Sequence, residues 1–330
     1  MEKQYIYIGN ASKSGVNKYL FSNGNLEFIS LTNDFERCTY LVQNESNIYA
    51  VQEIGNLNET GNVIAYKKSS KGLIYIDKKS SLGSGPCHIE ISGKNRMLFI
   101  SNYMNGYFTA YKLNNNGTIG KIIYNNVIDI NKSHLHCAKV FNNEKNLITV
   151  DLGMNILELY DIQSTGIQKL SEIKLEPNTE PRHIATDKND TIFLLTEKSC
   201  ELYVLNCKQD KLNILHKKSI LPKNHIKMQN DDTGAAIKIS ADGRYIYTTL
   251  RGHNSISVFK YENKKLELVQ NILSYGNTPR DLEIDKTQKY ILVANQDSDE
   301  ISIYSRDIDT GKLKFLNKQK SLLPTCVLSE

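Results

Sequence analysis

With 330 residues, 40% of them hydrophobic and 23% charged, the chain has the composition of an ordinary globular protein. Its net charge of +5 is mild, and no basic run is interleaved with aromatic residues, so we expect no nucleic-acid partner. The sequence has no apolar run of membrane-spanning length and no apolar core of a signal peptide near its start, so we expect a cytoplasmic protein without a membrane partner.

The six cysteines do not form a CxxC pair, which argues against a zinc site and a disulfide framework. Three of them, Cys87, Cys137 and Cys326, fall on or beside predicted strands, where a free cysteine serves as a small buried hydrophobe. We therefore expect reduced thiols, as in an intracellular protein.

A three-strand pattern repeats along the chain at intervals of about 45 to 53 residues, the range of a four-stranded propeller blade. Each copy has a first strand, an apolar β-branched second strand, a polar turn, and an alternating third strand. In chain order, the first strands are predicted near residues 37–43, 85–91, 134–140, 180–186, 234–240, 278–284 and 323–330. We align them on Tyr40, His88, His136, His183, Ala236, Asp281 and Cys326.

The two ends of the chain complete the count. Residues 4–22 supply a second and a third strand without a first, and residues 323–330 supply a first strand alone. Together they predict one shared blade, and therefore an all-β, seven-bladed β-propeller that forms a single domain over residues 1–330. Closure by both ends of the chain removes the free sheet edges that a linear array would leave. The stretch from Leu215 to Thr233 is predicted to be a loop insertion that could cover one face.

Antiparallel pairing places the start of each first strand beside the end of the second strand of the same blade. Because first strands are innermost, polar residues at both places should meet in one ring at one mouth of the channel. The first class contains His88, His134, His136, Arg182, His183, Arg280 and Asp281. The second class contains Glu53, Asn102, Tyr103, Asp151, Glu197, Arg251 and Gln296.

Such a ring predicts a polar pocket for a small anion. Arginine offers a planar donor fork suited to phosphate or carboxylate, and arginine or backbone donors can stabilise an oxyanion. A histidine with a carboxylate partner can take a proton near neutral pH. His134 and His136 lie at period two and could hold a metal, but no third ligand has fitting spacing, so we expect no metal and no organic cofactor.

Several motifs at matching blade phase resemble the lactonase family of seven-bladed propellers, typified by the propeller-type 6-phosphogluconolactonases. They include Gly85-Pro86-Cys87-His88, His134-Leu135-His136, Pro181-Arg182-His183, Thr196-Glu197, Arg251-Gly252-His253-Asn254, Thr278-Pro279-Arg280-Asp281 and Ala294-Asn295-Gln296-Asp297. The resemblance covers nearly the whole chain. The sequence departs from the family pattern at three places, with Ser133 before His134, Thr196 before Glu197, and Leu250 before Arg251.

The resemblance implies hydrolysis of a sugar-derived lactone, with 6-phosphoglucono-1,5-lactone as the first expected substrate, in the pentose phosphate pathway. It implies the catalytic residues His136, Glu197, Arg182, Arg251 and Arg280. The other ring residues are expected to bind substrate: His88, Asn102, Tyr103, His134, Asp151, His183, Asp281 and Gln296. We expect His136, oriented by Asp151 or Glu197, to activate water, in a monomer or weak homo-oligomer.

Two alternatives remain open at this point. The family also includes cyclases that form lactones from muconate-type acids, which would use the same arginine clamp with an acid in place of activated water. The chain could also be a non-enzymatic propeller that binds a small anion or a protein partner, because a fold does not fix a function. A protein-binding propeller should expose a broad apolar patch, whereas the predicted loops are rich in Lys, Asn and Glu.

Overall fold

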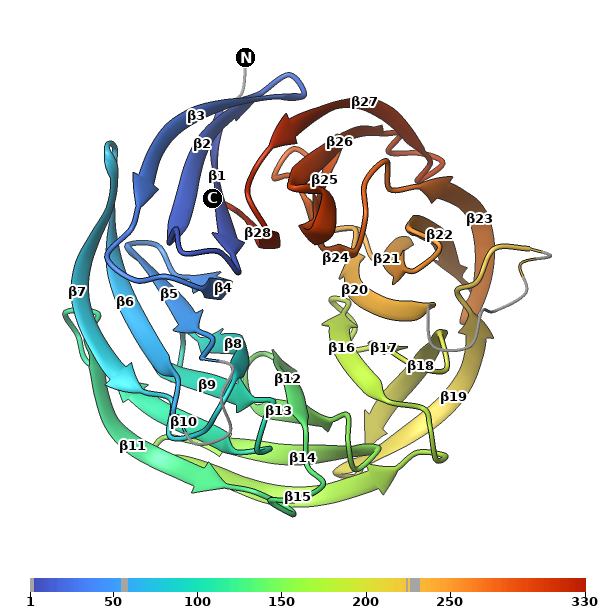
Figure 1. Ribbon diagram of the computed structural model, residues 1–330. Helices are drawn as coiled ribbons and strands as arrows, with labels where there is room; N and C mark the ends of the chain where they lie inside the picture. Colours follow the sequence, from blue (N-terminus) through green and yellow to red (C-terminus); the bar gives the residue numbers. More distant parts are fainter. Residues whose placement is uncertain (1–2, 55–58, 224, 226–231) are drawn as a thin grey trace.

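The computed structural model describes residues 3–54, 59–223, 225 and 232–330, and it forms a ring of seven four-stranded antiparallel sheets (Figure 1). This confirms the predicted seven-bladed propeller. The only helix among the described residues is a short 3-10 turn, η1 (Gln296–Ser298). The described part of the chain contains no helix long and apolar enough to cross a membrane.

Six blades follow the chain in order, each running from an innermost to an outermost strand. Their strands are β4 (Cys38–Gln43), β5 (Asn47–Gln52), β6 (Asn62–Ser69) and β7 (Gly72–Ser80); β8 (Pro86–Ser92), β9 (Met97–Asn102), β10 (Phe108–Leu113) and β11 (Ile119–Asn126); and β12 (Leu135–Phe141), β13 (Asn146–Asp151), β14 (Ile156–Gln163) and β15 (Gly166–Lys174). The next three blades are β16 (Pro181–Thr186), β17 (Ile192–Thr196), β18 (Glu201–Lys208) and β19 (Lys211–Ser219); β20 (Thr233–Ile239), β21 (Tyr245–Arg251), β22 (Ser255–Glu262) and β23 (Lys265–Leu273); and β24 (Pro279–Ile284), β25 (Tyr290–Asn295), β26 (Glu300–Arg306) and β27 (Leu313–Lys320).

The seventh blade is closed by both ends of the chain, as predicted. It contains β28 (Pro324–Ser329), β1 (Gln4–Asn10), β2 (Val16–Ser22) and β3 (Asn25–Thr32), with β28 innermost. Strand β28 pairs with β1 in antiparallel register, with Ile6 opposite Ser329 and Gly9 opposite Cys326. The strand at the C-terminal end of the chain therefore completes the blade that begins with β1.

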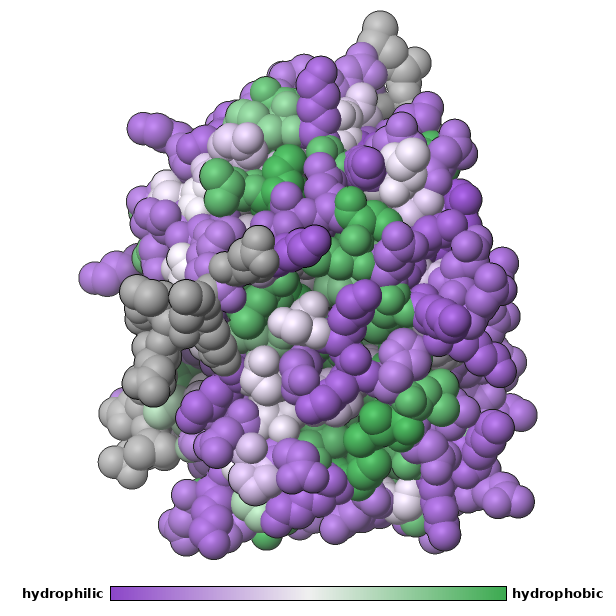
Figure 2. Space-filling view, turned by 90° about the vertical axis from the view of Figure 1, so that its right-hand side faces the viewer, coloured by the Kyte–Doolittle hydropathy of each residue, from purple (hydrophilic) through white to green (hydrophobic). Residues whose placement is uncertain are grey.

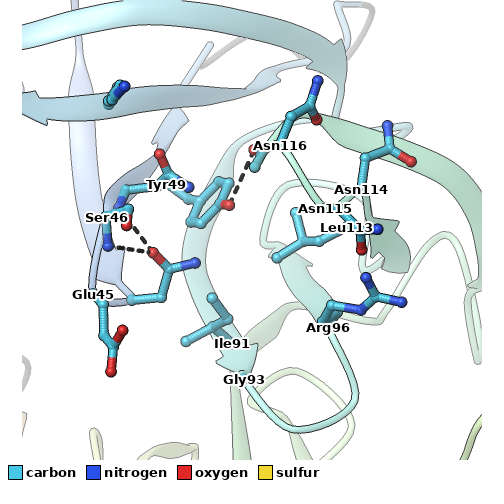
Figure 3. Close-up of a pocket in the computed structure, with 14 residues that line it drawn as sticks. Glu45, Ser46, Tyr49, Ile91, Gly93, Arg96, Leu113, Asn114, Asn115 and Asn116 are labelled. Carbon is cyan, nitrogen blue, oxygen red and sulfur yellow. Dashed lines mark hydrogen bonds between the residues drawn. The ribbon is translucent and has the colours of Figure 1, made fainter.

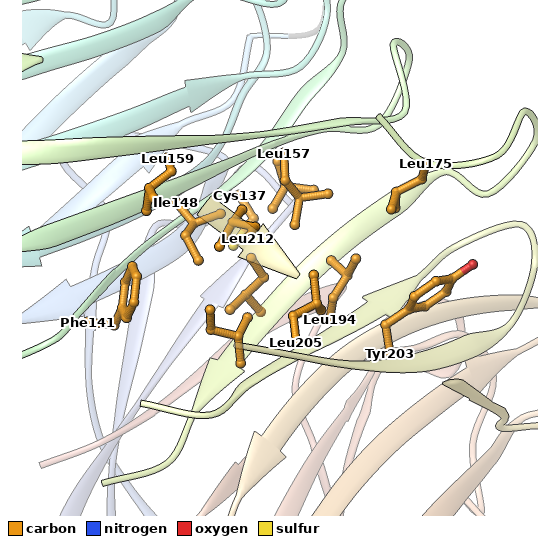
Figure 4. Close-up of a cluster of buried hydrophobic side chains, with 13 residues drawn as sticks. Cys137, Phe141, Ile148, Leu157, Leu159, Leu175, Leu194, Tyr203, Leu205 and Leu212 are labelled. Carbon is orange, nitrogen blue, oxygen red and sulfur yellow. The ribbon is translucent and has the colours of Figure 1, made fainter. Parts of the chain in front are cut away.

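The seams between blades hold the hydrophobic core. Seven clusters of buried residues occur, one at each junction between adjacent blades. Figure 4 shows the cluster between the β12–β15 and β16–β19 blades, where Leu157 and Leu194 pack from opposite sides of the seam. Because alternate residues of each middle strand face opposite seams, every residue of β9, β13 and β17 is buried and most of these residues are apolar.

A β-bulge interrupts the innermost strand of every blade close to its start. In β16, Pro181 pairs with Thr196 and His183 pairs with Leu195, which leaves Arg182 unpaired. The same shift occurs in the other six blades. Since a bulge sets two residues against one partner and re-aims their side chains, Arg182 and His183 both line a cavity inside the channel.

The bulge shows that His136 was aligned with the wrong residues of the other blades. His136 was aligned with His88 and His183, but Leu135 pairs with Asp151 and Cys137 pairs with Val150. His136 is therefore the unpaired bulge residue of its blade and corresponds to Arg182, whereas Cys137 corresponds to His183.

The insertion predicted from Leu215 to Thr233 is shorter than expected. Residues 215–219 belong to β19, which pairs with β18 as an ordinary outermost strand, and β20 begins at Thr233. Residues 224 and 226–231 lie outside the described residues, so the prediction that this stretch covers a face remains a prediction.

The outer side of the ring carries scattered apolar side chains. Figure 2 shows several hydrophobic patches interrupted by polar residues on the side where β23 is labelled in Figure 1. Leu273 on β23 and Leu316 on β27 are among the exposed large hydrophobic residues. All six cysteines have free thiols, and Cys87, Cys137 and Cys326 are buried, as predicted for these three.

Candidate active site

Arg182, Glu197 and Arg251 form the best-defined polar cluster at the channel mouth where the innermost strands begin. One carboxylate oxygen of Glu197 accepts from Nε of Arg182 at 3.0 Å and lies 2.9 Å from a terminal nitrogen of Arg251. Arg182 also donates to the carbonyl oxygen of Ala235. Burial, and then the charge of Arg251, lowers the pKa of Arg182 to about 10, which leaves it charged at neutral pH.

Arg280 approaches the same mouth from the β24 blade. It donates to Oε1 of Gln296 at 3.0 Å, and its distance to the carboxylate of Glu53 is 3.9 Å, at the long limit of an ion pair. Three guanidinium groups and two carboxylates therefore meet here, leaving one formal positive charge. The mouth consequently favours an anionic ligand.

His136 lies between these arginines and the interior of the channel. Its side chain is buried, and Nδ1 has no hydrogen-bond partner among the described residues. A cavity of about 10 Å³, the space of roughly one water molecule, is lined by His136, Arg182, Arg280, Thr39 and Thr325, among others. His136 can therefore meet a water molecule at the same point as two guanidinium groups.

Tyr103 and His134 form the aromatic side of the mouth. Their rings stack with centroids 4.8 Å apart, and Nδ1 of His134 lies 2.9 Å from the carbonyl oxygen of Tyr103. The ring of Tyr103 also meets His136 edge-on at 5.7 Å. Both residues are thus placed where a substrate entering the mouth would pass.

Deeper in the channel, His88, His183 and Asp281 lie below the arginines instead of in the same ring. The rings of Tyr40 and His88 are 4.4 Å apart, and those of His88 and His183 are 5.5 Å apart. Oδ2 of Asp281 accepts from the backbone nitrogen of Val327. The prediction that all these residues form one ring is therefore wrong. Each bulge places two consecutive residues in the channel, one below the other, so the polar residues form two layers.

Asn102 and Asp151, which were expected to bind substrate, hold the backbone instead. Asn102 is fully buried and donates to the carbonyl oxygens of Ser81 and Tyr107. A Cβ at Gly83 would come within 2.5 Å of Asn102 Cγ, so this loop is fitted to the asparagine. Oδ1 of Asp151 accepts from the backbone nitrogens of His134 and Met154, both at 3.0 Å, so Asp151 orients the loop that leads into β12.

Several residues of the site were missed by the sequence reasoning. The bulge position is occupied by Thr39, Cys87, Ala235 and Thr325 in the other blades, and Tyr40 closes the channel beneath them. A signal was present, because in four blades a proline opens the innermost strand immediately before the bulge residue: Pro86, Pro181, Pro279 and Pro324. These prolines mark the bulge in their own blades, whereas β12 begins with Leu135 and gives no such signal for His136.

A second cluster lies just before and after the β20–β21 pair. Nε2 of His225 is 2.7 Å from Oδ2 of Asp232, and the rings of His225 and His253 are 4.7 Å apart. The backbone nitrogen of His253 donates to Oδ1 of Asp232. Asp232 therefore holds His225 and His253 close together, and His253 follows Arg251 by two residues along the chain.

The stability of the protein should fall on mild acidification because of the buried histidines. Burial, followed by the charges of Arg182 and Lys139, sets the pKa values of His88, His136 and His183 well below 6.5. The unfolded chain binds protons below about pH 6.5 while the folded chain does not, so the free energy of unfolding should drop by up to about 1.4 kcal/mol per pH unit and per histidine.

Circular dichroism melts between pH 7.5 and 5.5 measure this effect. His183→Gln should make the decline in Tm shallower, and His216→Gln, a change on the outer strand β19, is the matched control. Equal slopes in the wild type and in His183→Gln would show that His183 does not remain neutral in the folded protein.

A larger cavity, of about 630 Å³, lies elsewhere, between the β4–β7 and β8–β11 blades. It opens on the side of the ring away from the arginine mouth, at the turns that join β4 to β5, β8 to β9 and β10 to β11. Asparagines and backbone line much of it (Figure 3). Tyr49 donates to the carbonyl oxygen of Gly117, and Asn44 accepts from the backbone of Ser46 and Asn47. Its lining has one arginine and no histidine, so the channel mouth is the better candidate for chemistry.

Comparison with known families gives one match over almost the whole chain. The model of the family described as "Lactonase, 7-bladed beta-propeller" matches residues 5–329. This range includes every blade and all of the arginines at the mouth.

Individual proteins are similar at lower identity. The chain is 28% identical to an uncharacterised protein of Staphylococcus epidermidis, over 95% of this chain and 96% of that one. It is 27% identical to a 6-phosphogluconolactonase of Bacillus subtilis, covering 88% and 86% of the two chains. Among solved structures, a periplasmic gluconolactonase of Pseudomonas aeruginosa has a TM-score of 0.90 at 20% identity, covering 99% of each chain, and supports the fold.

Proposed function

Because the chain belongs to the lactonase family of seven-bladed β-propellers, we propose that it hydrolyses a sugar-derived lactone, namely 6-phosphoglucono-1,5-lactone, to 6-phosphogluconate. The observation that carries the proposal is the water-sized cavity bounded by His136, Arg182 and Arg280. The Bacillus subtilis relative named 6-phosphogluconolactonase supports the choice of substrate. The proposal includes a cytoplasmic role in the pentose phosphate pathway, by a monomer or weak homo-oligomer.

The arginines would bind the anionic end of the substrate and polarise the lactone carbonyl. Arg182 is fixed by Glu197 and by the Ala235 carbonyl, so its orientation is set before substrate arrives. Among the described residues, Arg280 has only Gln296 at ordinary hydrogen-bond distance, which leaves it able to bind a phosphate or carboxylate. Preorganised donors of this kind stabilise the oxyanion without reorganising during the reaction.

The hydrolysis then needs one proton acceptor. Water attacks the carbonyl carbon and passes a proton to neutral His136, while the carbonyl oxygen becomes an oxyanion facing the arginines. Collapse of the tetrahedral intermediate breaks the bond to the ring oxygen, which takes the proton back from His136 and becomes the product hydroxyl. The lowered pKa of His136, due first to burial and then to Arg182, keeps it in the neutral form that can accept a proton.

His136→Gln tests this assignment of the base. We expect kcat to fall by roughly 100-fold or more, in the range of general base catalysis, with a smaller change in KM. The matched control is His88→Gln, which changes a buried channel histidine below the site. If His136→Gln kept wild-type turnover while Arg280→Ala lost it, another group would have to be the base, and His225 beside Asp232 would be examined next.

The substrate is tested by comparing phosphorylated and unphosphorylated lactones. Rates with 6-phosphoglucono-1,5-lactone and glucono-1,5-lactone are each corrected for spontaneous opening. The proposal predicts a higher kcat/KM for the phosphorylated lactone, and Arg280→Ala should reduce this preference. Faster conversion of a muconate-type acid to its lactone would favour the cyclase, and no reaction with any of these compounds would favour a binding protein.

A further inference from the structure

The channel contains a second polar chamber, at the end opposite the arginine mouth. Its cavity has a volume of about 290 Å³, and its wall includes Val42, Glu90, Lys139, Ala185, Lys238 and Leu328. These residues stand two positions beyond the layer of Tyr40 and His183 on their strands, so they form one ring below it. The rings of Tyr40, His88 and His183 separate this chamber from the cavity at His136.

The charges in this ring follow the order of the blades. Lys139 on β12 pairs with Glu90 on β8 at 2.9 Å, and Lys238 on β20 pairs with Glu283 on β24 at 2.6 Å. Between the two lysines, the position of the β16 blade in this ring is Ala185, and His183, Ile184 and Thr186 of the same strand also line the chamber. The sequence of charges around the wall is therefore negative, positive, gap, positive, negative.

This order gives the gap a positive potential even though the four charges sum to zero. Lys139 and Lys238 stand on the two blades beside the gap, whereas Glu90 and Glu283 stand one blade further away, and Coulomb energy falls with distance. Burial lowers the pKa of Lys238, but the charges of Glu283 and Asp281 and the hydrogen bond to Glu283 together outweigh burial and raise the pKa, so Lys238 is charged at neutral pH.

The chamber wall also includes one buried polar atom that has no hydrogen-bond partner among the described residues. Nδ1 of His88 is buried and lacks a hydrogen-bond partner among the described residues, and His88 lines the chamber. Its other ring nitrogen lies 3.6 Å from the thiol of Cys137. Buried polar atoms are normally hydrogen-bonded, so this nitrogen points to a ligand or ordered water on the chamber side.

We propose that this chamber binds a small oxyanion, a carboxylate or a phosphate, held between Lys139 and Lys238 above Ala185. The site is separate from the arginine mouth and does not depend on the activity proposed for it. Its two cations come from different blades, so the anion would bridge the blades on both sides of β16.

Isothermal titration with inorganic phosphate and, separately, with gluconate tests the proposal. Titrations use Arg280→Ala as the background, which weakens binding at the other mouth. Adding Ala185→Glu puts a carboxylate into the gap and should weaken the remaining binding by about tenfold or more. The probe that binds more tightly, phosphate or gluconate, identifies the class of oxyanion.

A second variant keeps the test valid if Ala185→Glu fails to fold. The double change Glu90→Gln with Lys139→Met removes an ion pair without leaving an unpaired charge, and it should also weaken binding by about tenfold. In crystals soaked with selenate, anomalous density should lie between Lys139 and Lys238. Unchanged affinity in both variants, or no density there, would overturn the proposal.

Discussion

Replacing Arg182 with alanine should lower kcat/KM for lactone hydrolysis by roughly 100- to 1,000-fold, the usual loss when one oxyanion donor is removed. Arg182 is the only arginine of the mouth that is almost fully buried, and it both lines the cavity at His136 and positions Glu197. Without it, Glu197 keeps Arg251 as its partner. The carbonyl oxygen would lose a donor fixed in place before substrate binds.

Arg306→Ala is the matched control for this experiment. Arg306 is also buried and donates to the hydroxyl of Tyr247 and to the carbonyl oxygen of Gln288. It lies on β26, and neither of these partners belongs to the mouth. We expect Arg306→Ala to lower Tm while keeping kcat/KM per folded molecule. A loss of activity in both variants that followed the loss of folded protein would mean that Arg182 acts only through stability.

Deleting residues 324–330 should prevent the ring from folding. The deletion removes β28, exposes the paired edge of β1, and removes the contacts of β28 with the innermost strands on both sides, β24 and β4. Cys326 and Val327 are buried in two different seams, and Val327 supplies a backbone donor to Asp281. We expect insoluble protein, or a circular dichroism spectrum without a cooperative melt.

A circular permutant separates the loss of the strand from the loss of the chain end. Joining Glu330 to Lys3 through a short Gly-Ser linker, and opening the chain between Asn115 and Asn116 in an exposed turn, keeps every strand. The ends are near each other, since the nitrogen of Glu330 donates to the carbonyl oxygen of Tyr5. This permutant should fold, whereas a folded truncated protein would refute the role of β28 in closing the ring.

The fold could be predicted from the sequence because its signal repeats. Apolar second strands such as those ending at Asn102 and Asn295 recur at a nearly constant interval, and the incomplete copies at the two ends complement each other. The fourth, outermost strand of each blade was not identified in the sequence itself and was expected only because propeller blades have four strands. They are exposed on one face and vary in their pattern, as in β19, whose last five residues were predicted to belong to a loop insertion.

The site was predicted less completely because its geometry depends on a bulge, and β12, which carries His136, lacks the proline that precedes the bulge residue in four other blades. Alignment on His136 matched histidine with histidine, although the backbone register matches it with Arg182. Asp151 and Asn102 were at the right end of their strands, yet their side chains turn to backbone partners of adjacent loops. The strand pairing seen in the structure is needed to tell polar residues that face the channel from those that hydrogen-bond to the backbone of the surrounding loops.

The most direct test of the central claim is the rate at which 6-phosphoglucono-1,5-lactone, made in situ, is hydrolysed in the presence of the wild-type protein. The account predicts a rate above spontaneous opening that is proportional to protein concentration and is lost in folded Arg182→Ala. A rate equal to the spontaneous one would contradict the proposed substrate. If a panel of other lactones also opened at their spontaneous rates, the assignment of lactone hydrolysis to the arginine mouth would be wrong.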